Sequence, residues 1–105
     1  MKLLTTTHFK YVFNKPKKIK FQELIILTRD NKLQFPRLGI SISRKDIKHS
    51  CRRNKTKRII REVFRLIQYK LICADFVVIV KLYFKNTNNI CLKEKLENLW
   101  SYYYR

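Results

Sequence analysis

The stretch DFVVIVKLYF, residues 75–84, decides the fold of this chain. After its first acid it runs through β-branched and aromatic residues with almost no polar interruption. Such a near-continuous apolar run is typical of a strand that is buried on both faces in the middle of a sheet. We therefore expect 75–84 to be a central strand, flanked by other strands and covered by helices.

Two β-rich runs precede this strand, ELIILTRD (23–30) and RLGISIS (37–43). The polar stretch between them, DNKLQFP (30–36), suits a hairpin loop with Pro36 at the strand entrance. The second run alternates two kinds of side chain, apolar Leu38, Ile40 and Ile42 against small Gly39, Ser41 and Ser43. We expect one of its faces to be buried and the other to be small and polar.

Three segments have helical spacing. Thr5, Thr6 and Thr7 offer caps for a short first helix that ends at Pro16 and carries Phe9, Val12 and Phe13. A helix over about 52–71 has one apolar stripe, made of Ile59, Ile60, Val63, Phe64, Ile67 and Leu71. A last helix repeats Leu92, Leu96, Leu99, Trp100 and Tyr103. We read the order as αβββαβα, which contains one strand more than the three β-rich runs located above. This order predicts an α+β two-layer sandwich, with helices packed on a four-stranded sheet in a single domain over 1–105.

The charge balance indicates an anionic partner. The 105 residues include 25 Lys and Arg against 7 Asp and Glu, a formal net charge of +18. There is no run of about 18 apolar residues, and the N-terminal apolar stretch is too short for a signal peptide. Three scattered cysteines favour reduced thiols over disulfides. We expect a cytoplasmic protein without a membrane partner.

The positive charge is concentrated in RRNKTKRIIREVFR (52–65), where the first acid is Glu62. On a helix, Asn54, Arg58, Arg61 and Arg65 gather opposite the apolar stripe, Lys57 flanks it, and Arg52, Arg53 and Lys55 surround the N-terminal turn. A helix face that serves only solubility would carry more acidic side chains between its basic ones. Cations at a helix N-terminus are disfavoured by the helix dipole, whereas phosphate groups would relieve that penalty. We expect this helix to bind nucleic acid.

RNA fits the pattern better than DNA. No helix lies three or four residues before 52–71, as in a helix-turn-helix, and no heptads follow it, as in a zipper. RNA binders often add aromatic side chains on which unpaired bases stack. Phe9 and Phe13 could serve in this way beside the sheet, or they could pack in the core, and the residues alone leave both interpretations open.

Catalysis by the chain's own side chains is not expected. The seven acids are scattered over separate segments of the chain, at Glu23, Asp30, Asp46, Glu62, Asp75, Glu94 and Glu97. His8 and His49 have no acid at catalytic spacing, and His49-Ser50-Cys51 lacks the paired cysteines of a zinc site. We therefore predict no catalytic residues and no metal site in the protein.

The segment RNKTKRIIREVFR (53–65) resembles the signature of the bacterial ribonuclease P protein component, Arg-Asn-Arg-x-(Lys/Arg)-Arg-x-x-Arg followed by a helix. HFKYVF (8–13), RLGISISRK (37–45) and DFVVIVK (75–81) are similar to further segments of that family at similar spacing. The resemblance runs from about Thr7 to Trp100. It implies the αβββαβα fold with a left-handed crossover through the basic helix.

The same resemblance implies a protein that joins a catalytic RNA in ribonuclease P and helps it to remove 5′ leaders from precursor tRNA. The active site and its Mg²⁺ would belong to the RNA, and no obligate protein partner is implied. Contacts to that RNA would come from Arg52, Arg53, Asn54, Lys55, Lys57, Arg58, Arg61 and Arg65. The leader would lie in a cleft lined by Phe9 and Phe13, with Lys45 near its rim.

Lys55 departs from the family pattern, which has Arg at that position. Lysine keeps the charge but loses the bidentate fork, so this contact is the least secure of the set. An alternative function is a structural RNA-binding protein, such as a ribosomal protein, with no role in processing.

Overall fold

A computed structural model of the chain describes residues 2–14, 16–21, 24–42, 50–80 and 89–105. In chain order its elements are β1 (Lys2–Leu3), α1 (Thr6–Asn14), β2 (Lys17–Phe21), β3 (Leu24–Asp30), β4 (Arg37–Ile42), α2 (Ser50–Ile67), the 3-10 turn η1 (Gln68–Lys70), β5 (Ala74–Val80), α3 (Asn89–Trp100) and the 3-10 turn η2 (Ser101–Tyr103). The predicted α+β class and αβββαβα order are confirmed. The two-residue strand β1 is added before them, at one edge of the sheet.

β5 is the central strand, as its apolar run predicts. Within the described residues the sheet order is β1-β4-β5-β3-β2. β5 pairs antiparallel with β3 and parallel with β4, so both of its edges are hydrogen-bonded. Residues 81–84 of the predicted strand lie outside the described residues.

The expected hairpin between 23–30 and 37–43 is wrong. β3 and β4 follow each other in the chain but are separated in the sheet by β5. The physical reason is that β5 is buried, so its backbone N–H and C=O groups need hydrogen-bond partners along both edges, which β3 and β4 supply from either side. The hairpin partner of β3 is β2, which pairs with it antiparallel from Lys17↔Thr28 to Phe21↔Leu24.

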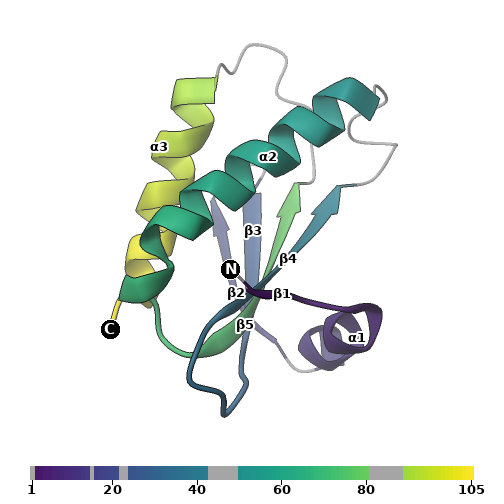
Figure 1. The fold of residues 1–105 in the computed structure, drawn as a ribbon, viewed down its shortest axis with the longest axis vertical. Helices are drawn as coiled ribbons and strands as arrows, with labels where there is room; N and C mark the ends of the chain where they lie inside the picture. Colours follow the sequence, from purple (N-terminus) through teal and green to yellow (C-terminus); the bar gives the residue numbers. More distant parts are fainter. Residues whose placement is uncertain (1, 15, 22–23, 43–49, 81–88) are drawn as a thin grey trace.

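The connection from β4 to β5 passes through α2 and is left-handed. In Figure 1 both strands point upward, α2 crosses in front of the sheet, and β5 lies to the left of β4. Parallel strands joined by a crossover are right-handed in about 98% of cases. This exception agrees with the family resemblance.

The main core lies between one face of the sheet and the two long helices. The predicted apolar stripes of α2 and α3 are buried there against β3, β4 and β5. Its centre is aromatic, because the Phe76 ring makes edge contacts with Trp100 at 5.1 Å and Tyr103 at 5.0 Å between centroids. Tyr103 belongs to η2 rather than to the predicted last helix, yet it is buried as the spacing suggested.

The opposite face of the sheet carries a smaller core under α1. Val12 of α1 is fully buried against Ile25, Leu27 and Val77. Among the described helices, α2 and α3 pack on the main core, and α1 is the one that packs on this face.

An ion pair ties β4 to β5 at the edge where both strands begin. Asp75 is completely buried and accepts two hydrogen bonds from Arg37, from Nε at 2.7 Å and from Nη2 at 2.6 Å. Asn31 donates a third at 3.0 Å. A buried carboxylate is tolerated when its oxygens are satisfied in this way. Sequence reasoning counted Asp75 only as a scattered acid and missed this contact.

Candidate nucleic-acid interface

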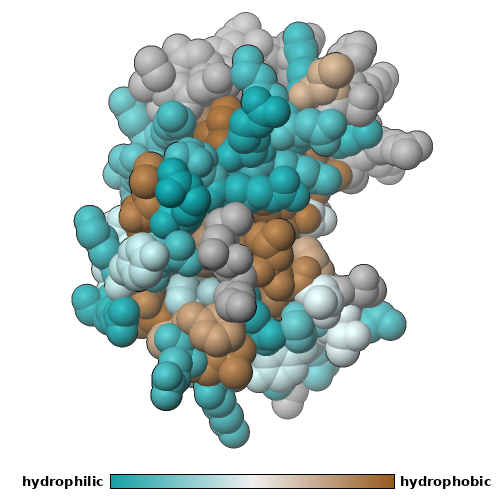
Figure 2. Space-filling model, viewed as in Figure 1, coloured by the Kyte–Doolittle hydropathy of each residue, from teal (hydrophilic) through white to brown (hydrophobic). Residues whose placement is uncertain are grey.

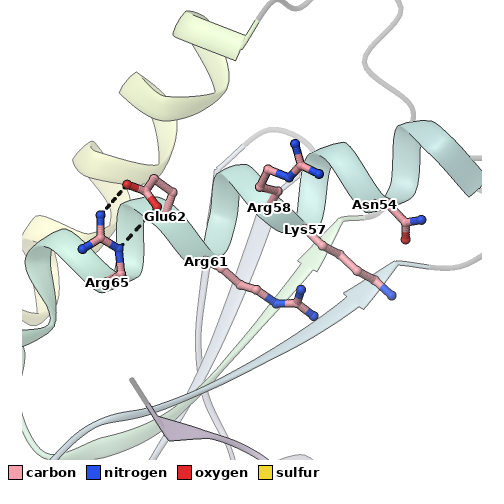
Figure 3. A pocket seen from close by; sticks show the side chains of 6 residues that line it. All are labelled: Asn54, Lys57, Arg58, Arg61, Glu62 and Arg65. Carbon is pink, nitrogen blue, oxygen red and sulfur yellow. Dashed lines mark hydrogen bonds and ion pairs between the residues drawn. The ribbon is translucent and has the colours of Figure 1, made fainter.

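The side of α2 that faces away from the core is cationic, as predicted. A shallow groove along the helix is lined by Asn54, Lys57, Arg58, Arg61, Glu62 and Arg65 (Figure 3). The apolar stripe on the opposite side of α2 is buried against the sheet, which fixes this orientation. The geometry therefore presents the predicted residues together, while their contacts to RNA remain a prediction.

The positive charges of this groove are not equivalent. Arg65 forms an ion pair with Glu62 at 2.6 Å, and this hydrogen bond lowers the pKa of the Glu62 carboxyl. Within the described part of the chain, Arg58 and Arg61 have no ion-pair partner. The unneutralised charge of the groove therefore lies at Lys57, Arg58 and Arg61.

Arg52, Arg53 and Lys55 lie in the first two turns of α2, which begins at Ser50 rather than at 52. Arg52 and Lys55 are exposed and Arg53 is half-buried. The first turn contains no acid that would balance the helix dipole. The N-terminal end of α2 is thus strongly electropositive, as the sequence indicates.

Lys57 and Arg61 also line a hollow that α2 shares with α1 and the sheet edge. This cavity of about 140 Å³ has an apolar floor made of Leu3, Leu4, Phe9, Leu38, Gly39 and Ile40. In Figure 2 an apolar patch lies directly below the hydrophilic band of α2, where the surface is hollowed. The hollow joins the two predicted sites, because Phe9 and the basic helix line it together.

Gly39 makes the close approach of α1 possible. A Cβ atom at this position would lie 2.6 Å from Cζ and 2.9 Å from Cε1 of Phe9. The small face that the sequence predicts for β4 is therefore the face under α1. Only glycine leaves room for the Phe9 ring at this distance from the strand.

Phe9 and Phe13 stand next to each other on α1 but differ in burial. Their rings are stacked, with centroids 6.4 Å apart and planes inclined by 21°. Phe9 is half-buried over Gly39, whereas Phe13 is 47% exposed. The residue with which α1 enters the core is Val12. Lys45, the third predicted cleft residue, lies outside the described residues.

Two lysines that sequence reasoning did not select lie on the same face of the sheet as this aromatic pair. Lys18 pairs with Leu27 and Lys20 with Ile25, and paired residues share a face. Both lysines are exposed. The signal that could have identified them is the alternation of Lys18 and Lys20 with Ile19, which packs against the main core.

The candidate metal ligands of the described residues are dispersed or already engaged. No three of His, Cys, Asp and Glu are grouped so that they could hold a metal ion in that part of the chain. His8 lies with Nε2 2.9 Å from Nη1 of Arg37, and the Asp75 carboxylate is occupied by Arg37. Among the same residues, no helix is long and apolar enough to cross a membrane.

Fold and surface together define a small cationic α+β protein, in which a basic helix makes a left-handed crossover and borders a half-covered sheet face. The family model described as Ribonuclease P matches residues 1–104. The chain belongs to the family of the bacterial ribonuclease P protein component.

Individual relatives agree with this assignment. The chain is 52% identical to the ribonuclease P protein component of Buchnera aphidicola subsp. Baizongia pistaciae over 104 residues, which cover 99% of this chain and 91% of the relative. The fold matches the RNase P protein of Staphylococcus aureus with a TM-score of 0.89 at 26% identity, over 97% of this chain and 94% of that one. It matches the RNase P protein of Thermotoga maritima with a TM-score of 0.85 at 30% identity, over 97% of both chains.

Membership of the family makes the chain a protein component of ribonuclease P, an endoribonuclease that acts in tRNA processing, and it implies an RNA subunit as partner.

Proposed function

We propose that this chain binds the catalytic RNA of ribonuclease P through α2 and holds the 5′ leader of precursor tRNA across the sheet face beside α1. The carrying observation is the shared hollow, in which Lys57 and Arg61 of the basic helix meet Phe9. A protein that only scaffolds RNA needs the basic helix but has no use for an aromatic pair beside it. The proposed site of action is the cytoplasm.

The proposed contacts to the catalytic RNA are electrostatic. Arg58 and Arg61 project unneutralised guanidinium groups, which can make bidentate contacts to phosphate. Asn54 and Lys57 extend the same groove toward the N-terminus of α2, where the helix dipole favours anions. Lys55 would contribute charge without the bidentate geometry that arginine provides.

The proposed leader contacts combine stacking with charge. The exposed Phe13 ring, stacked beside Phe9, offers a surface for an unpaired base. Lys18 and Lys20 lie along the same sheet face and could contact the phosphates between such bases. On this path the 5′ leader would run from Phe13 past Phe9 to Arg61, toward the RNA bound on α2.

In this proposal the protein supplies no reacting group. Hydrolysis and the Mg²⁺ that it requires belong to the RNA subunit. The protein's positive charge screens repulsion between the catalytic RNA and its RNA substrate, and this effect is largest when Mg²⁺ is scarce.

The test is reconstitution with a bacterial ribonuclease P RNA at low Mg²⁺ concentration. We expect no cleavage of precursor tRNA by RNA-free protein and faster cleavage by the RNA when the protein is added. The matched control is the Arg58→Ala/Arg61→Ala variant, which should fold normally because both residues are exposed, yet lose most of the acceleration. Cleavage by the protein alone, or an RNA that reacts equally fast without it, would contradict the proposal.

A further inference from the structure

Exposed tyrosines lie in the segments that follow α2 and α3, and none of them lines the hollow shared with α1. Tyr69 is 78% exposed and Tyr102 is 73% exposed, while Tyr104 is exposed to a smaller degree. Leu66, also exposed, precedes Tyr69 by one helical turn. Neither the basic groove nor the proposed leader site uses these side chains.

The tyrosines are presented by an ordered connection between two segments. Leu71 and Tyr104 form an antiparallel bridge, in which Ile72 N–H donates to Tyr103 O at 3.0 Å and Arg105 N–H donates to Lys70 O at 2.8 Å. Tyr103 anchors the second segment because its ring is buried against Phe76. Tyr102 and Tyr104, on either side of Tyr103, are therefore held outward by the fold.

The surroundings of this tyrosine patch (Tyr69, Tyr102 and Tyr104) are cationic. Lys70 Nζ lies 5.8 Å from the centroid of the Tyr104 ring, and the Arg105 guanidinium donates to Tyr69 O at 2.9 Å. Residues 63–74 and 98–105 include no Asp or Glu. The nearest acids along the chain are Glu62, Asp75 and Glu97, of which Glu62 is paired with Arg65 and Asp75 with Arg37. The positive charge around the tyrosines is complementary to an anionic partner. The exposed tyrosine rings favour a partner that also has flat groups for stacking.

The tyrosine patch continues the basic groove along α2. Arg65 follows Arg58 by seven residues, which places both on the same side of α2, and Tyr69 lies in η1, the 3-10 turn that directly follows α2. From Arg58 to its last residue, Ile67, α2 advances by about 14 Å, and Tyr69 follows two residues later. One RNA segment could therefore contact the arginines with its phosphates and the tyrosines with its bases.

We propose that the tyrosine patch stacks on unpaired bases of the RNA that the basic groove binds. The proposal rests on the proposed function, since it assumes that α2 is the RNA-contacting helix. Base stacking on exposed aromatic rings tolerates any sequence, because every base has a π-face. The partner is thus a single-stranded stretch of the RNA subunit, next to the backbone that α2 contacts.

The test compares Tyr69→Ala/Tyr102→Ala with Tyr69→Phe/Tyr102→Phe, using a bacterial ribonuclease P RNA without precursor tRNA as the probe. The Kd is measured over a range of salt concentrations. We expect the alanine variant to bind about five-fold more weakly, or worse, for each ring removed. The phenylalanine variant should bind as the unchanged protein does, because it keeps the stacking surface. The slope of log Kd against log salt should stay the same in both, because neither change removes a cationic side chain from the phosphates.

The comparison variant is Arg58→Ala/Arg61→Ala, which should flatten the salt slope by about 0.7 to 0.9 for each phosphate that is no longer neutralised. If this variant behaves so and the tyrosine variants bind as tightly as the unchanged protein, the stacking proposal is wrong and the proposed function stands. If no variant changes binding, both fail. If the phenylalanine variant binds as weakly as the alanine variant, the tyrosines act through hydrogen bonds of their hydroxyl groups, and the stacking proposal is wrong. A concentration-dependent dimer in sedimentation that Tyr69→Ala abolishes would make the patch an interface between copies of the chain.

Discussion

The two faces of the sheet are covered to very different extents. On one face α2 and α3 bury an aromatic cluster in which Phe64, Phe76 and Trp100 are inaccessible to solvent. On the other face α1 buries Val12 over three sheet residues and leaves Phe13 exposed. The difference teaches that one face holds most of the buried core, while the other leaves apolar and cationic side chains exposed.

The largest expected effect comes from truncating aromatic rings on the two faces. Phe64→Ala should lower the free energy of unfolding by about 3 to 5 kcal/mol, because it leaves a cavity in the main core. On the face that carries α1, called the open face below, the matched change is Phe13→Ala. It should lower the free energy of unfolding by less than about 1 kcal/mol, because water already reaches much of the ring. Urea denaturation of both variants measures the difference. Equal losses would mean that α1 is as much a part of the core as α2.

A smaller effect is expected at the contact between Gly39 and Phe9. Gly39→Ala should destabilise the protein by about 1 to 3 kcal/mol, because the new methyl group overlaps the Phe9 ring and forces it to move. Ser41→Ala, on the same face of the same strand, is the control and should change stability by no more than about 0.5 kcal/mol.

A double-mutant cycle tests the cause of this destabilisation. In a Phe9→Ala background the penalty of Gly39→Ala should largely disappear, because the ring that it overlaps is gone. An equal penalty in both backgrounds would place the strain in the β4 backbone rather than in the contact with α1.

The open face can also be tested through binding of the ligand proposed for it, the 5′ leader of precursor tRNA. In the reconstituted enzyme, Phe13→Ala should weaken binding of precursor tRNA by about 1 to 3 kcal/mol if the ring stacks on a leader base. Binding of mature tRNA, which has no leader, should be unchanged. Equal affinities of the variant and the unchanged protein for precursor tRNA would remove Phe13 from the proposed leader site.

The smallest effect concerns the edge of the main core at alkaline pH. Burial raises the pKa of the Tyr103 hydroxyl above its ordinary value of 10.0. The unfolded chain therefore loses this proton first, so the contribution of Tyr103 to stability is complete below about pH 10 and declines as the pH rises further. In Tyr103→Phe, the fall of the urea midpoint between about pH 9 and 11 should be shallower than in the unchanged protein. Tyr102→Phe, at an exposed position, should keep the original dependence.

Much of the fold could be predicted because its signals are local. The uninterrupted apolar run around Phe76 predicted a central strand, and the stripe from Ile59 to Leu71 predicted which side of α2 is buried. β2 was not located, because Lys17–Phe21 contains three lysines and resembles a surface loop. Its strand character comes from pairing with β3, an interaction that no local pattern shows.

The candidate site, like the fold, was predictable from the sequence only in part. By itself, the sequence determined that positive charge gathers on one side of α2, since helical spacing alone places Asn54, Arg58 and Arg61 there. It left open whether Phe9 and Phe13 belong to the core. The tertiary structure decided that α1 enters the core through Val12, with Phe9 over Gly39 and Phe13 toward solvent.

Strand order and the shared hollow were likewise decided only in three dimensions. Insertion of β5 between β3 and β4 replaced the expected hairpin, and it set the faces on which α1 and α2 lie. The hollow between Phe9 and Arg61 brings together residues that are far apart in the chain. The physical reason is that helical periodicity fixes which way a side chain points from its own element, whereas the neighbours it meets depend on how all the elements pack together.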